Sequence, residues 1–137
     1  MIRKIDHVGI AVSDAEKALG VYRDLLGLPC EEIEEVVSQK LLSYHLRAGE
    51  SHLELLVPTD PSSTIARFLE KRGEGIHHIA LAVDDLAAER ARLVAGGLEP
   101  IGEPSMGANG KRIQFFHPRS TGGILLEICS KEGGGAA

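Results

Sequence analysis

The chain has 137 residues, of which 43% are apolar, and its formal net charge is −5 at pH 7. This length suits one compact domain with a buried core, and the acidic balance offers no basic surface for nucleic acid or an anionic membrane. No apolar run is long enough to span a bilayer, and no signal region precedes the first expected strand. We therefore expect a cytoplasmic protein that binds small molecules or other proteins.

The most informative pattern is an internal repeat, in which the peptide IDHVGIAV at 5–12 returns as IHHIALAV at 76–83. The repeat puts His7 and His78 at the same point of two expected strands. Self-similarity of this kind is the signature of a duplicated structural unit. We expect two copies of one module, each with an imidazole in its first strand.

The expected elements, taken along the chain, repeat the order βαβββ. The first module comprises a strand at 5–12, a helix at 14–26 and strands near 32–37, 41–48 and 51–57. A short helix at 63–72 leads to the second module, which comprises a strand at 76–83, a helix at 85–96 and strands near 99–104, 112–117 and 123–129. This pattern predicts an α+β fold.

Ordinary start and stop signals mark these elements. Asp14 and Asp85 are of the type that caps a helix N-terminus, as is Ser62 or Ser63 for the joining helix. The pair Asn109-Gly110 is typical of a tight hairpin turn. We expect one domain over 1–132, with a first module at about 1–60, a linker helix at about 61–74, a second module at about 75–132 and a disordered tail at 133–137.

Strand periodicity predicts which way the two histidines face, because side chains two residues apart share one face of a strand. His7 shares its face with a glycine and an alanine, and His78 shares its face with two alanines. The branched residues between them point to the other face, where the helices would pack. A face of small residues beside a polar group leaves space for a ligand.

Each module ends in a strand with one glutamate among apolar residues, Glu54 in the first and Glu127 in the second. Taken singly, such a glutamate often faces solvent, and a strand histidine is often a satisfied core group. A buried carboxylate is costly unless it is paired, hydrogen-bonded or bound to a metal. Because all four residues recur in register, we interpret His7, Glu54, His78 and Glu127 as one ligand set for a divalent ion such as Co²⁺, Mn²⁺, Ni²⁺, Zn²⁺ or Fe²⁺.

The duplicated pattern resembles the vicinal oxygen chelate, or glyoxalase, superfamily, and within it the sequence is similar to the methylmalonyl-CoA epimerase family. The similarity runs from Ile5 to about Cys129 and is densest in IDHVGIAV, EEIEEV, LELL, FLEKRGEGIHHIA and FFHPRSTGGILLEIC. The resemblance implies a half-open, curled mixed sheet built from two βαβββ modules. It also implies a metal-dependent epimerase that interconverts (2R)- and (2S)-methylmalonyl-CoA.

The resemblance further implies an acyl-CoA substrate, a homodimer and metal ligation by the four residues named above, with Co²⁺ as our first choice and Mn²⁺, Ni²⁺, Zn²⁺ or Mg²⁺ as alternatives. Inversion at C2 needs an acid or base on each side of the carbon, and Glu127 is our candidate for one of them. For the other, Ser43 stands where some members of the family have a glutamate. His45 shares the face of Ser43 and is our hypothesis for the second group, because imidazole titrates near neutral pH.

Contacts to CoA are expected around the last hairpin and the HPRS segment. Lys111 and Arg119, together with Arg112, are candidates for pairing with the CoA phosphates, although cations beside a turn are often only solvated. Ser120 and the amides of Gly122-Gly123 are candidates for contacts to the substrate carboxylate.

Three alternatives use the same fold. A glyoxalase I can use the same metal ligands, but Ala11 and Pro58 stand where bacterial enzymes of that kind have an arginine and an asparagine for glutathione. An extradiol dioxygenase needs a His, His, Glu triad and an aromatic-rich pocket, whereas this chain has three Phe, two Tyr and no Trp. A metal-free small-molecule binding module would hold no metal and would tolerate Glu127→Gln.

Overall fold

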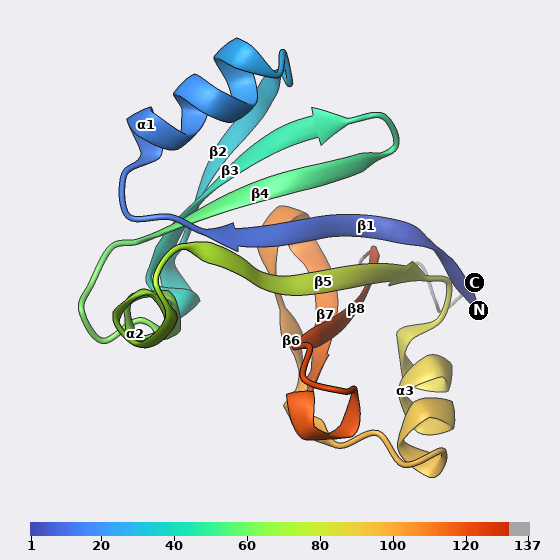
Figure 1. Cartoon of the computed structure of the whole chain (residues 1–137). Helices are drawn as coiled ribbons and strands as arrows, with labels where there is room; N and C mark the ends of the chain where they lie inside the picture. Colours follow the sequence, from blue (N-terminus) through green and yellow to red (C-terminus); the bar gives the residue numbers. More distant parts are fainter. Residues whose placement is uncertain (132–137) are drawn as a thin grey trace. The chain divides into compact units, whose positions relative to one another are not determined.

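The computed structural model describes residues 1–131, which fall into two compact units (Figure 1). The N-terminal unit spans His7–His77, and the C-terminal unit consists of Met1–Asp6 together with the chain from His78 onward. The first six residues of the chain are therefore grouped with its second half. The tail expected at 133–137 and the last residue of the expected domain lie outside the described residues.

The N-terminal unit contains a four-stranded mixed sheet in the order β2-β3-β4-β1. β1 and β4 are parallel, whereas β2, β3 and β4 are successive antiparallel neighbours. The strands are β1 (Ile2–Ala11, of which 7–11 belong to this unit), β2 (Cys30–Val36), β3 (Leu41–Ala48) and β4 (Ser51–Pro58). The helices are α1 (Ala15–Leu19), its π-helical continuation η1 (Gly20–Leu25), the 3-10 turn η2 (Val37–Gln39) and α2 (Thr64–Arg72).

The two faces of this sheet differ in character. Leu19 of α1 packs against one face in an apolar cluster with Ile10, Val12, Leu46 and Leu55. Side chains of the other parity, including that of His7, point to the opposite face. Part of that opposite face is covered by α2, whose Ile65 packs against Ala11, Leu41 and Leu56. The sheet therefore places its branched residues under α1, as the periodicity predicts, and leaves polar side chains on the other side.

The C-terminal unit repeats this arrangement with the strand order β5-β8-β7-β6. β5 and β8 are parallel, and β8, β7 and β6 are successive antiparallel neighbours. Leu86 of α3 packs against one face with Val83, Phe116 and Ile128. The elements are β5 (Gly75–Val83, of which 78–83 belong to this unit), α3 (Leu86–Ala95), β6 (Pro100–Met106), the 3-10 turn η3 (Ala108–Gly110), β7 (Lys111–Phe116), the 3-10 turn η4 (Pro118–Ser120) and β8 (Leu126–Lys131).

The predicted βαβββ order is confirmed in both halves, and with it the α+β class. Two elements differ from expectation. The helix expected at 14–26 is α-helical only over Ala15–Leu19 and continues as a π-helix over Gly20–Leu25. The strand expected at 123–129 begins only at Leu126, because Gly122 and Gly123 take positive φ angles of 77° and 99° and form a loop instead. Within residues 1–131, no helix is long and apolar enough to cross a membrane.

The predicted helix caps are also confirmed. The side chain of Asp14 accepts a hydrogen bond from the Lys17 amide at 3.2 Å, and that of Asp85 accepts one from the Ala88 amide at 3.1 Å. Of the two serines considered for α2, Ser63 is the cap, accepting from the Ala66 amide at 2.9 Å. These bonds satisfy amides that the first turn of each helix leaves without a partner. The chain therefore begins its helices where the sequence predicts.

Candidate active site

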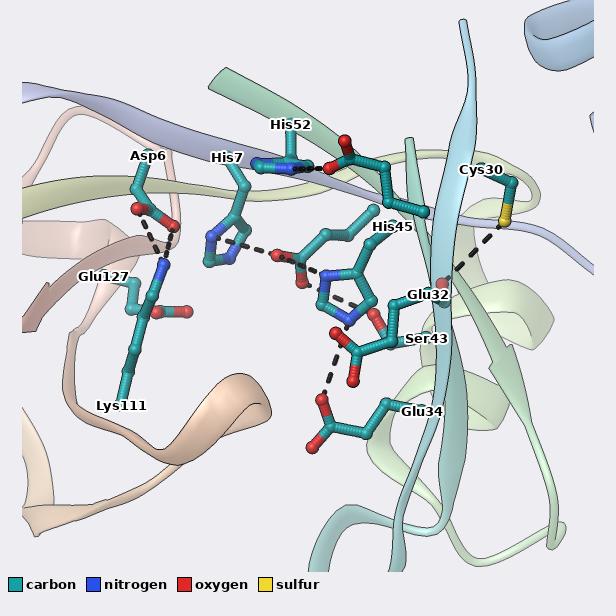
Figure 2. Close-up of polar contacts among 12 residues, drawn as sticks. Asp6, His7, Cys30, Glu32, Glu34, Ser43, His45, His52, Lys111 and Glu127 are labelled. Atoms are coloured by element: carbon teal, nitrogen blue, oxygen red, sulfur yellow. Dashed lines mark hydrogen bonds and ion pairs between the residues drawn. The ribbon is translucent and has the colours of Figure 1, made fainter. Parts of the chain in front are cut away.

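Glu54 is the centre of a buried polar cluster in the N-terminal unit, and Figure 2 shows its three neighbours. Its Oε2 lies 3.2 Å from His7 Nδ1 and 3.5 Å from His45 Nδ1, and its Oε1 accepts a hydrogen bond from the Ser43 hydroxyl at 3.4 Å. Glu54 and His7 are each 6% exposed, and Ser43 and His45 are more deeply buried still. A carboxylate removed from water in this way needs such neighbours to offset its desolvation.

Strand register explains why these side chains meet. Glu54 on β4 lies opposite Gly9 on β1 and opposite His45 on β3. Residues that are opposite in a sheet share a face, so one neighbour adds no side chain and the other sets an imidazole beside the carboxylate. His7 precedes Gly9 by two residues and projects from the same face.

The C-terminal unit holds a matching pair. His78 Nε2 lies 3.3 Å from Glu127 Oε1, and both residues are buried. Glu127 lies opposite Ala80 on β5 and opposite Phe115 on β7. The ring of Phe115 packs edge-on against the His78 imidazole, with centroids 5.5 Å apart. Ala80 thus corresponds to Gly9, whereas Phe115 stands where the first module has His45.

Each of these His/Glu pairs fits two neighbouring ligands of one divalent ion. Two ligand atoms that are each about 2.1 Å from a metal, at an angle of about 90–109°, lie roughly 3.0–3.4 Å from each other. The observed nitrogen–oxygen distances are 3.2 Å for His7–Glu54 and 3.3 Å for His78–Glu127. Imidazole and carboxylate donors together suit first-row divalent metals. Each unit therefore contains one pair of side chains able to hold a divalent cation.

Lys111, predicted as a CoA contact, forms a two-pronged ion pair within the C-terminal unit. Its ammonium lies 2.8 Å from each carboxylate oxygen of Asp6 (Figure 2), and Asp6 is only 8% exposed. Sequence reasoning missed this pair, because the two residues are 105 positions apart and nothing in the local pattern links them. The ammonium is therefore engaged by a buried carboxylate, and a role toward CoA stays a prediction.

Arg119 and Ser120 tie the η4 turn to Glu99. Arg119 donates to both Glu99 oxygens, at 2.8 Å from Nε and 2.5 Å from Nη2, and this pairing holds the pKa of Glu99 below its usual range. Ser120 Oγ accepts from the Glu99 amide at 3.0 Å and donates to the His117 carbonyl at 2.8 Å. Because the Arg119 side chain is 68% exposed, water screens its ion pair and its guanidinium remains accessible. Their contacts to CoA stay predictions.

Two further histidines have local packing or pairing roles. His52 Nε2 lies 3.0 Å from Glu31 Oε1, and Glu31 also accepts a hydrogen bond from Arg47 at 2.7 Å. Arg47 first, and His52 second, hold the pKa of Glu31 below its usual range. His77 packs edge-on against Phe68, with ring centroids 5.1 Å apart, and it points to the opposite face of its strand from His78.

Comparison with known proteins identifies the family. The sequence matches the Glyoxalase/Bleomycin resistance protein/Dioxygenase superfamily over residues 4–128. Since this match spans nearly all of the chain, the protein belongs to that superfamily. The duplicated modules are therefore those of a glyoxalase fold, and the predicted family is confirmed.

Within the superfamily, the chain is similar to several methylmalonyl-CoA epimerases. The ethylmalonyl-CoA/methylmalonyl-CoA epimerase of Cereibacter sphaeroides is 38% identical over 131 residues, covering 93% of this chain and 98% of that protein. A variant of the Streptomyces coelicolor methylmalonyl-CoA epimerase in complex with 2-nitronate-propionyl-CoA is 33% identical, with a TM-score of 0.91 over 96% of this chain and 99% of that chain. A methylmalonyl-CoA epimerase in complex with methylmalonyl-CoA and NH4+ is 33% identical, with a TM-score of 0.92 over 98% of both chains.

The Asp6–Lys111 pair predicts a stability effect. Lys111→Met should lower the free energy of unfolding by about 3 kcal/mol, because it leaves a buried carboxylate without its counter-ion. Adding Asp6→Asn should restore part of the loss, since the uncompensated charge is then gone. Urea denaturation of the single and double variants measures both effects. Arg112→Met is the matched control, because Arg112 is exposed and its replacement should change stability by less than about 0.5 kcal/mol.

A Lys111→Met protein as stable as the parent would contradict this assignment. If that variant instead bound CoA thioesters more weakly at unchanged stability, Lys111 would be a phosphate contact, as first expected from the sequence.

Proposed function

We propose that this chain is a metal-dependent epimerase that interconverts (2R)- and (2S)-methylmalonyl-CoA by moving the proton at C2. The observation that carries the proposal is the repetition of one buried His/Glu contact in both modules, at 3.2 Å and 3.3 Å. It is supported by relatives of similar length that are named as epimerases of this substrate. The substrate suits such a site, because its C2 proton lies between a thioester carbonyl and a carboxylate.

We propose that His7, Glu54, His78 and Glu127 hold one divalent ion together. The two carboxylates balance the charge of the ion, and the two imidazoles complete a ligand set of mixed nitrogen and oxygen donors. Co²⁺ remains our first choice, with Mn²⁺, Ni²⁺, Zn²⁺ or Mg²⁺ as alternatives. When bound, such an ion supplies Lewis-acid stabilisation of the oxyanion that develops as C2 loses its proton.

In this proposal, side chains of the protein move the C2 proton. Inversion requires that one group removes the proton from one side of C2 and another returns a proton from the other side. We assign these roles to Glu127 and His45. The asymmetry between the modules supports this choice: beside its glutamate the first module has the imidazole of His45, whereas the second has Phe115, which cannot carry a proton. Ser43 can support Glu54 by its hydrogen bond, but a serine hydroxyl is a poor base.

For the CoA portion of the substrate, we favour Arg119 over Lys111. The Arg119 side chain is 68% exposed, whereas the Lys111 ammonium is paired with the buried carboxylate of Asp6. Ser120 remains our candidate near the substrate carboxylate, although its hydroxyl also secures the η4 turn. We further propose that the protein acts in the cytoplasm as a homodimer.

Deuterium exchange tests the reaction. When the protein is incubated with racemic methylmalonyl-CoA and Co²⁺ in D₂O, deuterium should enter C2, and a chelator should stop the exchange. NMR or mass spectrometry of the thioester measures both. The hemithioacetal of glutathione and methylglyoxal is the control substrate. Exchange on that adduct alone would indicate a glyoxalase I and refute the proposal, and so would binding of methylmalonyl-CoA with no exchange under any metal.

A variant of His45 tests whether Glu127 and His45 are the two proton-transfer groups. His45→Ala should slow epimerisation by about 10²–10⁴-fold, the usual contribution of a general acid or base. Deuterium exchange of one epimer should nevertheless persist, because Glu127 still removes the proton on its own side. His52→Ala is the control, since its ring lies 6.5 Å from that of His45 and bonds to Glu31 instead. Full turnover of both epimers by His45→Ala would remove His45 from the mechanism.

A further inference from the structure

We propose that Lys40 and Arg67 form a binding site for the pyrophosphate of the CoA thioester. This inference rests on the proposed function, because it assigns contacts to the CoA portion of that substrate. The two cations come from different elements of the N-terminal unit: Lys40 follows the η2 turn, and Arg67 lies on α2. CoA also carries a separate 3′-phosphate, for which Arg119 remains our candidate.

Both cations reach the same residue, Ser62. Lys40 Nζ donates to the Ser62 hydroxyl at 2.6 Å, and Arg67 Nη2 donates to the Ser62 carbonyl at 2.9 Å. These two acceptor oxygens carry no formal charge, so they do not neutralise the cations that contact them. Because all three residues are exposed, a phosphate that arrives from solvent can reach both cations and form charge-assisted hydrogen bonds with them.

The backbone holds Lys40 in this place. Lys40 has a φ angle of 56° and a ψ angle of 52°, a left-handed conformation that costs free energy in a residue with a side chain. Its amide donates to the Val37 carbonyl at 3.2 Å, and its carbonyl accepts from the Thr59 amide at 2.9 Å. These bonds tie the start of β3 to the chain just after β4, so the ammonium is held near Ser62 by fixed backbone.

One carboxylate, that of Asp60, lies beside the two cations. Its Oδ1 accepts from the Ser62 hydroxyl at 2.6 Å and from the Ser62 amide at 2.8 Å, and these bonds hold the pKa of Asp60 below its usual range. Two cations face this one carboxylate, so the cluster keeps a net positive charge in a chain whose formal net charge is −5. A lysine and an arginine side by side suit a phosphate group, which offers several acceptor oxygens.

The cluster lies on the side of the sheet that carries the buried cluster around Glu54. Ile65 of α2 packs against Leu41 and Leu56. Leu41 shares its face of β3 with His45, because side chains an even number of residues apart point the same way. Leu56 likewise shares its face of β4 with Glu54. Helix α2 therefore covers the same face of the sheet as these two polar residues.

The distance along the sheet fits the length of the substrate. Lys40 precedes His45 by five positions, which corresponds to about 16 Å at about 3.3 Å per residue. About thirteen covalent bonds separate the thioester sulfur of CoA from the nearer phosphorus atom, and an extended chain of that length also spans about 16 Å. A thioester held beside Glu54 and His45 therefore places its pyrophosphate at the distance of Lys40.

Binding of CoA tests the proposal. The double variant Lys40→Met/Arg67→Met should weaken binding of CoA about tenfold, because it removes two exposed ion pairs with phosphate. It should weaken binding of dephospho-CoA, which keeps the pyrophosphate, by the same factor. Isothermal titration calorimetry measures both. Lys17→Met/Arg23→Met is the matched control, because it removes the same charges from exposed residues on the other face of the sheet and should bind CoA like the parent.

Turnover gives a second measurement. In Lys40→Met/Arg67→Met, KM for methylmalonyl-CoA should rise about tenfold while kcat changes by less than about twofold, because a remote phosphate is bound equally in the ground state and the transition state. With methylmalonyl-pantetheine, which has no phosphate, this variant should match the parent. Asp60→Asn should lower KM for methylmalonyl-CoA about twofold, since it removes the one anion that repels the phosphate.

Unchanged binding of CoA by the Lys40→Met/Arg67→Met protein would overturn the site. An equal loss in the Lys17→Met/Arg23→Met control would also overturn it, because the effect would then follow from net charge alone. A loss for CoA but not for dephospho-CoA would refute the pyrophosphate assignment. A parent protein that binds CoA but does not epimerise methylmalonyl-CoA would instead overturn the proposed function.

Discussion

The structure depends on the burial of one carboxylate in the last strand of each module. Glu54 and Glu127 lie in strands otherwise filled by apolar residues, where an unpartnered charge would cost more than the marginal stability of a domain allows. Each is retained because an imidazole lies within 3.3 Å of it and because the residue opposite on the first strand of the module is glycine or alanine. The neighbouring imidazole and the small residue opposite together make each glutamate suited to binding a cation.

Duplication places a similar His/Glu pair in each module, and divergence gives each pair different neighbours. The position opposite the glutamate on the neighbouring antiparallel strand holds His45 in the first module and Phe115 in the second. Phe115 packs edge-on against His78 and so places an apolar ring beside the His/Glu pair of the second module. His45 adds an imidazole next to Glu54. An epimerase needs two different proton-transfer groups, so this divergence supports the proposed reaction.

Much of this was predictable from the sequence. The repeat, the period of two and the cap residues predicted the βαβββ order, the face of each histidine and the starts of all three helices. The two His/Glu contacts followed because side chains at equivalent places in the two modules lie on the same face of their strands. By contrast, the Asp6–Lys111 pair joins residues 105 positions apart, and no local pattern links them. The role of Lys111 toward CoA stays a prediction. The start of β8 was expected too early, because Gly122 and Gly123 form a loop.

The central claim is that one ion is held jointly by a ligand pair from each module. A titration of the metal-free protein with Co²⁺, followed by absorption spectroscopy and by the metal content after dialysis, tests it most directly. The account predicts one tightly bound ion per chain, lost alike when His7 in the first pair or His78 in the second is replaced by alanine. Two ions per chain, or a variant in which one pair binds with unchanged affinity after the other has been removed, would contradict it.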